Sequence, residues 1–318
     1  ADKKCAEAVA VAVEECAADT QGQTCYICTE ALHWKTREGL VRGCACRGTA
    51  GFVHVSCLAE QAKIWVAEAE ENNLGNDALY ERFRRWDTCR LCEQDYHGVV
   101  LCALGWVCWK TYLGRPDGDE IRGHAMNLLG NGLHEVGHHE DELSAREAEL
   151  STLRRLGGTE AELLGVLGNL AITYSVLGRP EALQMKRDVY TGYLRLYGEE
   201  GGDTITAASN YARCLSNLRR FEEAKSLLRK TMPVARRVIG ERHELMLRMR
   251  WNYGMALYKD PDATLDDLRE AVSKHEELER TARRVLGGAH PDAVGIEKSL
   301  RDARAALRAR EAEAVRVA

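Results

Sequence analysis

Eight cysteine and histidine residues near the start of the chain are spaced as metal ligands. They form four pairs: Cys25-x2-Cys28, Cys44-x-Cys46, His54-x2-Cys57 and Cys89-x2-Cys92. Thiolate and imidazole groups suit Zn²⁺, which takes four of them in a tetrahedron, and two cysteines separated by two residues present both thiolates to one ion. Four pairs therefore predict two Zn²⁺ ions. Ordinary buried cysteines are a poor explanation for four such pairs within residues 25–92.

The cysteines are unevenly distributed along the chain. Of the 12, nine lie between Cys25 and Cys108, and only Cys214 lies beyond them. The apolar run at residues 8–13 is six residues long, too short for the apolar region of a signal peptide. We therefore expect a reducing compartment, in which clustered cysteines are metal ligands rather than disulfides. The remaining cysteines complete no further pair and are expected to be buried thiols, namely Cys5, Cys16, Cys102 and Cys108.

The ligand order, four cysteines, a histidine and three cysteines, resembles the RING-CH (RINGv) variant of the RING finger. The resemblance covers roughly residues 24–97 and is carried by the C-x-C pair, by the seven residues between Cys46 and His54, and by the stretch RGCACRGTAGFVHVSCL at 42–58. It implies cross-braced ligation, with one zinc on Cys25, Cys28, His54 and Cys57 and the other on Cys44, Cys46, Cys89 and Cys92. Neither site then closes without chain from the other, so zinc binding and folding are expected to be one event.

The same resemblance implies an E3 ubiquitin ligase with no catalytic residue of its own. RING fingers hold a ubiquitin-charged E2 enzyme so that its thioester is attacked by a lysine, which is catalysis by positioning. Ile27 matches the apolar first-knuckle position that contacts the E2, although such a residue also fills the knuckle core. Relatives usually carry a Trp where this chain has Gln61, and the nearest tryptophan is Trp65.

A PHD finger is the competing interpretation, because it has the same ligand order and an aromatic residue shortly before its last pair. Trp86 is such a residue, and Trp34 is a second candidate for a peptide-binding cage. The C-x-C pair and the seven-residue gap favour RING-CH. The 31 residues between Cys57 and Cys89 predict a helical insertion over about 58–86, with a break near residues 72–75.

The composition of the whole chain is that of a globular protein. Hydrophobic residues make up 45% of the 318, and there are 28 glycines and 5 prolines, which excludes disordered and collagen-like chains. The 44 basic and 49 acidic residues give a net charge of -5, so no basic field predicts nucleic-acid binding. The longest apolar stretch, residues 99–109, is shorter than the roughly 20 residues of a membrane span. We expect an intracellular protein, cytoplasmic rather than nuclear.

After a turn-rich linker, a repeating pattern predicts paired helices. A glycine preceded three residues earlier by arginine recurs at Gly157, Gly198, Gly240 and Gly287, with spacings of 41, 42 and 47 residues. Arginine in a last helical turn complements the helix dipole, and glycine can adopt the left-handed cap. A second set, GNLA, SNYA and WNYG, begins at 168, 209 and 251. Helix, turn and helix at a fixed period is typical of an α-solenoid.

A unit of about 42 residues with an early N-L/Y-A, GRPEA at 178–182 and GERH at 240–243 resembles the tetratricopeptide (TPR) repeat of kinesin light chains. The resemblance covers about residue 122 to the end and implies a groove that binds a peptide or protein. We expect about four repeats, near 123–158, 163–200, 204–242 and 246–288, followed by a capping helix from about 291 to 313.

Three asparagines recur on the first helix of successive pairs, and their amides could bond the backbone of an extended ligand. The alternative is that they bond within the solenoid. They are Asn169, Asn210 and Asn252. The tract LHEVGHHED at 133–141 lacks helical spacing for paired metal ligands. We expect its histidines and acidic residues to be ordinary polar residues of a loop.

The predicted architecture is mainly α, with a small cross-braced two-zinc finger followed by an α-solenoid. Its parts are a helical or flexible extension (1–23), the finger with its helical insertion (24–97), a bridging segment and linker (98–121) and the solenoid (122–318). The predicted function is an E3 ligase that binds a charged E2 through the finger and its substrate through the solenoid. The alternative is a non-catalytic adaptor in which the finger is only an interaction or folding unit.

Overall fold

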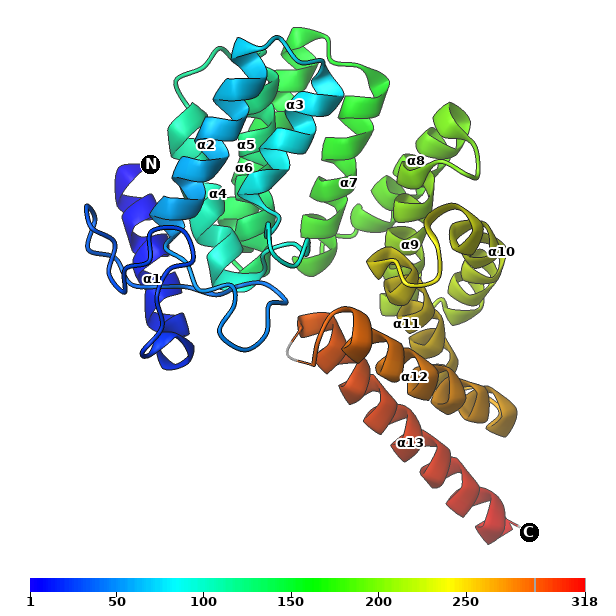
Figure 1. The fold of residues 1–318 in the computed structure, drawn as a ribbon. Helices are drawn as coiled ribbons and strands as arrows, with labels where there is room; N and C mark the ends of the chain where they lie inside the picture. Colours follow the sequence, from blue (N-terminus) through cyan, green and yellow to red (C-terminus); the bar gives the residue numbers. More distant parts are fainter. Residues whose placement is uncertain (289, 318) are drawn as a thin grey trace. The chain divides into compact units, whose positions relative to one another are not determined.

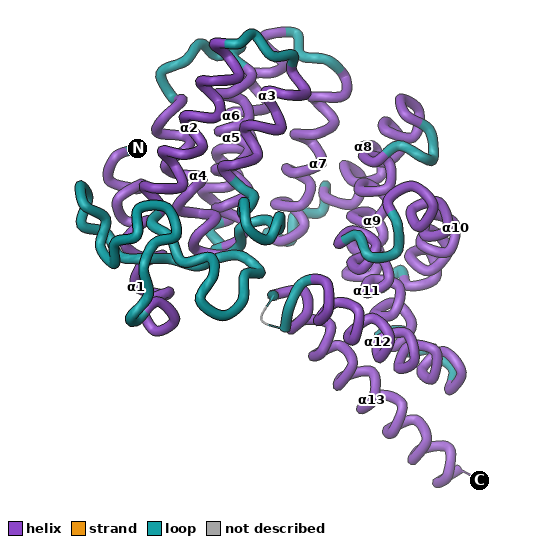
Figure 2. The backbone as a smooth tube through the Cα atoms, in the orientation of Figure 1, coloured by secondary structure: helices purple, strands orange, loops and turns teal. Residues whose placement is uncertain are grey.

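The computed structural model describes every residue except Ala289 and Ala318. In this described part all regular elements are helices, and β pairing is limited to two isolated bridges, Val41 with Val53 and Thr88 with Asp95. Figure 2 shows a long stretch of loop between the first two helices, residues 21–54, which carries the first two ligand pairs and His54. The chain divides into two compact units, Ala1–Gly158 and Thr159–Ala318. The prediction of a mainly helical chain is confirmed.

The first unit combines the cysteine-rich segment with helices on either side of it. The extension at 1–23 contains α1, and the predicted helix break near 72–75 separates α2 from α3 (Figure 1). The elements are α1 (Asp2–Thr20), α2 (Val55–Glu71), α3 (Asn76–Phe83), the 3₁₀ turn η1 (Arg84–Trp86), α4 (Gly98–Tyr112), α5 (Glu120–Glu135) and α6 (His139–Leu156).

One hydrophobic core joins the finger to its neighbouring helices. It contains Phe52 and Val53 from the finger, Phe83 and Trp86 from the inserted segment, and Leu104 from α4. The insertion therefore packs onto α4 instead of projecting as a free arm. Because the apolar run at 99–109 forms most of α4, the segment expected to be a bridge supplies much of this core.

Two glycines let α4 and α5 pack closely. A Cβ on Gly132 would lie 2.7 Å from the Cα of Cys102, and one on Gly105 would lie 3.0 Å from the carbonyl oxygen of Leu128. Close approach of this kind buries the backbone of both helices against each other. As a result α5 and α6, which we expected to be the first repeat of the solenoid, lie in the same compact unit as the finger.

The second unit is an array of consecutive antiparallel helices. Each helix packs on the next, and α7, α9, α11 and α13 also contact one another in succession. This double contact pattern is that of an α-solenoid. Its helices are α7 (Glu160–Val176), α8 (Ala182–Tyr197), α9 (Gly202–Asn217), α10 (Phe221–Ile239), α11 (Glu244–Tyr258), α12 (Leu265–Val285) and α13 (Pro291–Val317).

The recurring glycines end helices, as the sequence predicts. Gly157 caps α6 in the left-handed conformation, with φ 72° and ψ 37°. Gly240 follows α10 with φ 83° and ψ 162°, a region open almost only to glycine, so the chain extends sharply away from the helix end. The last copy of the pattern, at 287–292, includes Ala289, which lies outside the described residues.

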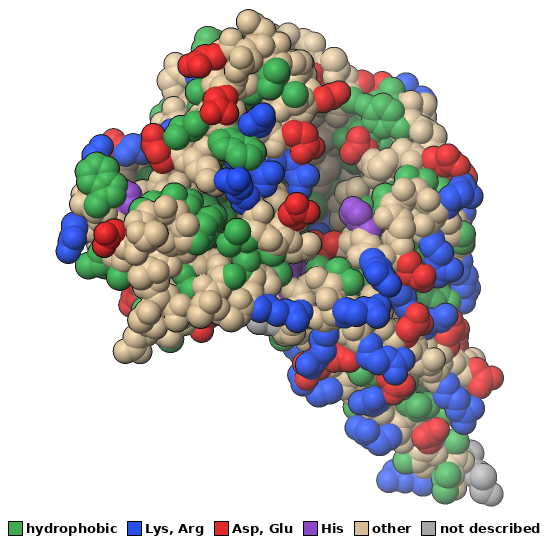
Figure 3. Space-filling model, in the orientation of Figure 1, with side chains coloured by type: hydrophobic (Ala, Val, Ile, Leu, Met, Phe, Trp, Pro, Cys, Tyr) green, Lys and Arg blue, Asp and Glu red, His purple; other side chains and the backbone are tan. Residues whose placement is uncertain are grey.

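The surface of the second unit mixes both signs of charge. Figure 3 shows basic and acidic side chains interspersed over α12 and α13, and ion pairs join the two helices, such as Arg283 with Glu297 and Arg304 with Glu276. In the described part of the chain, no helix combines the length and the apolar character needed to cross a membrane.

Candidate metal centre

The structure brings the eight predicted ligands together as two groups of four. The first group is Cys25, Cys28, His54 and Cys57, and the second is Cys44, Cys46, Cys89 and Cys92. Within each group, the sulfur and nitrogen atoms that could bind a metal lie within 4.8 Å of one another. The grouping interleaves the four pairs along the chain, as the cross-braced arrangement requires.

The first cluster is organised around a correctly oriented histidine. Nδ1 of His54 lies 3.3 Å from Sγ of Cys28 and 3.6 Å from Sγ of Cys57. Its other nitrogen, Nε2, lies 3.4 Å from the carbonyl oxygen of Ala31. An Nε2–H donated to a backbone carbonyl leaves the lone pair on Nδ1 directed at the thiols, which is the usual outer-shell support of a metal-bound imidazole.

The two C-x2-C turns have the same backbone geometry. In the first, the amides of Cys25 and Thr29 donate to the carbonyls of Glu30 and Cys25. In the second, Cys89 and Glu93 repeat the pattern with Gln94 and Cys89. Thr29 and Glu93 both have positive φ, 65° and 55°. The backbone of each turn therefore fixes the positions of its two cysteines in the folded chain.

The second cluster depends on a glycine in the loop before His54. In this cluster Sγ of Cys46 lies 3.8 Å from Sγ of Cys89. Gly51 has φ 85°, and a Cβ there would lie 2.6 Å from Cβ of Cys46 and 3.3 Å from Sγ of Cys44. The loop backbone therefore approaches the thiols more closely than any other residue type allows.

The electrostatics of both clusters suit a divalent cation. Burial lowers the pKa of His54, which favours the neutral imidazole that binds metals. Burial, together with the charge of Cys89, raises the pKa of Cys46 to about 12. A hydrogen bond with Cys89 and burial raise the pKa of Cys44 well above its usual range. The same hydrogen bond lowers the pKa of Cys89 to about 4, so one thiolate of this cluster forms readily while its neighbours resist ionisation until a cation compensates the charge. The donor set fits Zn²⁺ in both clusters, as S₃N and S₄.

Apolar side chains are exposed on the two C-x2-C turns and on the loop that follows the first of them. Ile27 is half-buried, whereas Leu32 is 45% exposed, Trp34 71% and Leu91 50%. The resemblance to RING fingers pointed to Ile27 alone; Leu91, an apolar residue inside the last C-x2-C pair, carries a comparable sequence signal. Gln61, at the position where relatives usually carry Trp, is half-buried on α2.

The structure excludes Trp86 as part of the aromatic peptide-binding cage that a PHD finger would need. Trp86 is 0% exposed and packs edge-on against Tyr112, with ring centroids 5.9 Å apart. A side chain enclosed in the core cannot line a cage for a peptide.

The three recurring asparagines occupy equivalent helices of the solenoid. Asn252 is buried, and its Nδ2 lies 3.5 Å from Oγ of Ser209 on α9. For Asn252 the structure therefore shows a hydrogen bond within the solenoid, which was the alternative to binding the backbone of a ligand. Asn169 and Asn210 are half-buried on α7 and α9.

A separate hollow of about 560 Å³ lies where the ends of α9 and α11 face α13. Its lining includes Asn217, Met255, Tyr258 and Asp302. None of the three asparagines lines it, and the sequence pattern did not single out any of its residues.

Comparison with known proteins gives one family match and several weak structural similarities. Residues 25–92 match the RING-variant domain (RINGv). A search of curated protein sequences finds no match. The chain is similar to BtubC (BKLC) from P. vanneervenii, with 17% identity, 82% of this chain and 91% of that chain covered, and a TM-score of 0.44. It is also similar to a putative kinesin light chain with nearly identical TPR-like repeats from Podosopora anserina, with 15% identity, coverages of 73% and 97%, and a TM-score of 0.43.

These TM-scores are too low to define a fold, so the solenoid assignment rests on the helix packing described above. The family match has firmer support, because it begins at Cys25 and ends at Cys92, the first and last of the eight clustered ligands. Sequence pattern, cross-braced geometry and family match therefore agree: residues 25–92 of this chain are a RING-variant domain.

Proposed function

We propose that the protein is a RING-type E3 ubiquitin ligase whose RING-variant domain holds a charged E2 enzyme. The observation that carries the proposal is the pair of interleaved Cys/His clusters with exposed apolar side chains beside them. The finger needs no nucleophile, because the E2 thioester supplies the activated ubiquitin and the ligase contributes its position. Two Zn²⁺ ions, one on each cluster, would act as structural ions that shape this surface.

The docking surface for the E2 is proposed to comprise Ile27, Leu32, Trp34 and Leu91. Trp34 lies next to His33, whose ring stands edge-on to that of the ligand His54 with centroids 5.3 Å apart. The exposed tryptophan therefore directly follows a residue whose ring packs on the first cluster. Exposed aromatic and aliphatic anchors of this kind dominate the binding energy of protein interfaces. Relatives usually carry a tryptophan where this chain has Gln61. We propose that Trp34 provides the exposed indole of the finger instead.

The solenoid is proposed to recruit the substrate. The hollow beside α13 offers Met255 and Tyr258 as apolar contacts and Asn217 and Asp302 as polar ones. Holding a target on the same chain as the E2 raises the effective concentration of its lysines without any further catalytic group. We therefore infer that the finger binds the E2 and that the second unit binds a segment of the substrate protein.

The test is autoubiquitination of the full zinc-loaded chain with E1, ubiquitin and a panel of E2 enzymes. We expect ubiquitin ladders that are lost in Cys28→Ala and reduced at least about tenfold in Ile27→Ala and Trp34→Ala, since removing an interface hot spot costs about 2 kcal/mol or more. Ile64→Ala is the matched control, because Ile64 is 49% exposed on α2, outside the proposed surface. Zinc content is measured for every variant.

A non-catalytic adaptor is the second candidate, and Gln61 is the observation that favours it. If no E2 yields ladders while both finger clusters hold zinc, the finger is an interaction or folding unit. Equal ladders from Trp34→Ala and Ile64→Ala would instead refute the proposed docking surface while leaving ligase activity established.

A further inference from the structure

A third group of metal-binding side chains lies where α5 turns into α6, outside the RING-variant domain. His134 is in the last turn of α5, His139 begins α6, and Glu142 is in the first turn of α6. Their ring nitrogens and carboxylate oxygen lie within 4.8 Å of one another. From the sequence we expected only the polar residues of a loop here. That expectation missed the cluster because His134 lies on α5, across the turn from His139 and Glu142, which are three residues apart on α6.

Both imidazoles are directed at one oxygen atom. Nδ1 of His134 lies 3.0 Å and Nδ1 of His139 lies 3.1 Å from Oε2 of Glu142. Zinc bonds to nitrogen and oxygen of about 2.0–2.1 Å place neighbouring tetrahedral ligands about 3.4 Å apart. In the finger, the comparable distance from Sγ of Cys28 to Nδ1 of His54 is 3.3 Å. The three donor atoms at the turn therefore need to separate only slightly to admit an ion.

The burial of the three side chains also suits an ion. The side chain of Glu142 is 2% exposed, whereas those of His134 and His139 are 35% and 23% exposed. An ion bound here would offset the desolvation cost of the Glu142 carboxylate, in addition to the partners that it already has. The half-exposed rings leave one side of the cluster accessible to solvent. Three protein ligands with an accessible fourth position are the arrangement of an open zinc site, and two imidazoles with a carboxylate suit Zn²⁺.

The turn holds these side chains in place through its backbone. The amide of His138 donates to the carbonyl of Leu133 at 3.0 Å, and the amide of Glu142 donates to the carbonyl of His138 at 2.9 Å. Gly137, with φ 74°, permits the reversal. The end of α5 is also fixed to α4, because the amide of Gly98 donates to Oε2 of Glu135 at 2.9 Å. A site held by its backbone loses little conformational entropy when an ion binds.

We propose that His134, His139 and Glu142 form a third metal site, of the Zn²⁺ class, that clamps the end of α5 to the start of α6. The site is separate from both finger clusters, shares no ligand with them and does not depend on the proposed ligase activity. Its fourth coordination position is open to water or to an external ligand.

The test is calorimetric titration of Zn²⁺ into the full chain with the finger already loaded. We expect one further saturable equivalent. Because even outer-shell changes weaken metal binding about 10- to 100-fold, His134→Ala and Glu142→Gln are each expected to weaken this equivalent at least tenfold. His138→Ala is the matched control, since His138 is the exposed histidine of the same turn and is not in the cluster. The zinc content of the finger shows whether each variant is folded.

Co²⁺ provides a second measurement. Filling the additional site is expected to add visible ligand-field absorption without the thiolate-to-metal charge-transfer bands of the finger, because its donors are nitrogen and oxygen. Absence of a further equivalent in the unmodified chain would overturn the proposal. An equivalent that persists unchanged in the double variant His134→Ala, His139→Ala would do so as well, and the cluster would then be only a hydrogen-bonded set at two helix ends.

Discussion

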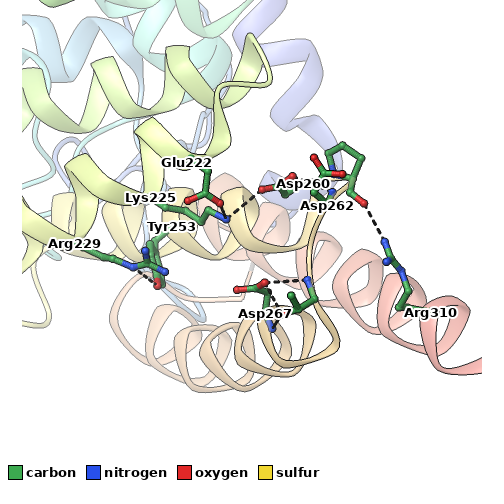
Figure 4. Close-up of polar contacts among 10 residues, drawn as sticks. Glu222, Lys225, Arg229, Tyr253, Asp260, Asp262, Asp267 and Arg310 are labelled. Carbon is green, nitrogen blue, oxygen red and sulfur yellow. Dashed lines mark hydrogen bonds and ion pairs between the residues drawn. The ribbon is translucent and has the colours of Figure 1, made fainter. Parts of the chain in front are cut away.

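Two buried lysines in the second unit show how partners decide the effect of a charge. Lys225 is 4% exposed in its side chain and forms ion pairs with Asp260 at 3.1 Å and Glu222 at 2.5 Å (Figure 4). Lys186 is 6% exposed, and among the described residues no ion pair to it is found. Burial lowers the pKa of Lys186 to about 8. The charge of Lys225 is therefore compensated by two carboxylates, whereas burial without such a partner destabilises the charged form of Lys186.

The contrast predicts opposite effects of replacing the two lysines by methionine. The folded-state pKa of Lys186 lies below its unfolded value of about 10.4, so the charged form opposes folding in full below about pH 8, and this cost disappears as the pH rises toward about 10.4. Lys186→Met is expected to stabilise the chain by up to about 3 kcal/mol at pH 7, with the gain shrinking at pH 9.5.

Lys225→Met is expected to destabilise the chain by about 3–5 kcal/mol, because it leaves Asp260 buried without its cation. Urea unfolding of both variants at pH 7 and pH 9.5, followed by circular dichroism, measures these differences. A Lys186→Met variant that is less stable than the unmodified chain at pH 7 would contradict the argument from burial.

At the scale of elements, the contact between α4 and α5 joins the finger to the helices that follow it. Gly132 on α5 faces the backbone of α4, with Leu101 O only 2.9 Å from the place of a Cβ. Gly123, on the same helix, is exposed and has no atom within 4 Å of that place. Close packing of α5 on α4 therefore requires glycine at 132 but not at 123.

We therefore predict that Gly132→Ala and Gly123→Ala change stability in opposite directions. The added methyl of Gly132→Ala meets rigid backbone and should cost about 1–3 kcal/mol through overpacking. Gly123→Ala should gain up to about 1 kcal/mol, since alanine favours the helix more than glycine. Urea unfolding of the two variants gives both values. Equal stability of the two variants would show that α4 and α5 do not pack as closely as described.

At the scale of the whole molecule, we expect zinc and helix packing to stabilise different parts of the chain. The core of the first unit includes ligands of both clusters, among them Cys25, Cys57 and Cys89. The second unit has cores of its own, formed by the contacts between successive helices. We therefore expect metal binding to contribute to the folding free energy of the first unit, because the second unit contains no residue of either finger cluster.

Removing zinc is expected to unfold the two units unequally. After treatment with a strong chelator under reducing conditions, amide hydrogen exchange should rise sharply in the finger and in α4, whose backbone packs on it, while α9 to α12 keep their protection. Hydrogen exchange followed by mass spectrometry resolves these segments. Equal loss of protection in both units would show that the solenoid depends on the finger for its stability.

Local spacing accounts for what could be predicted from the sequence alone. The ligand pairs, the break between α2 and α3 and the helix ends at Gly157 and Gly240 depend on residues a few positions apart, whose geometry the backbone dictates. The interleaving of the pairs came from the family resemblance, because spacing alone does not say which pairs share an ion.

Only the tertiary structure showed which helix faces meet. It placed α5 and α6 with the finger because small residues let α5 approach α4, and it buried Asn252 against Ser209. It also brought His134, His139 and Glu142 to one point across a turn. Contacts of this kind arise when faces of separate helices pack together, and the packing of those faces, rather than the spacing of residues along the chain, decides which side chains touch.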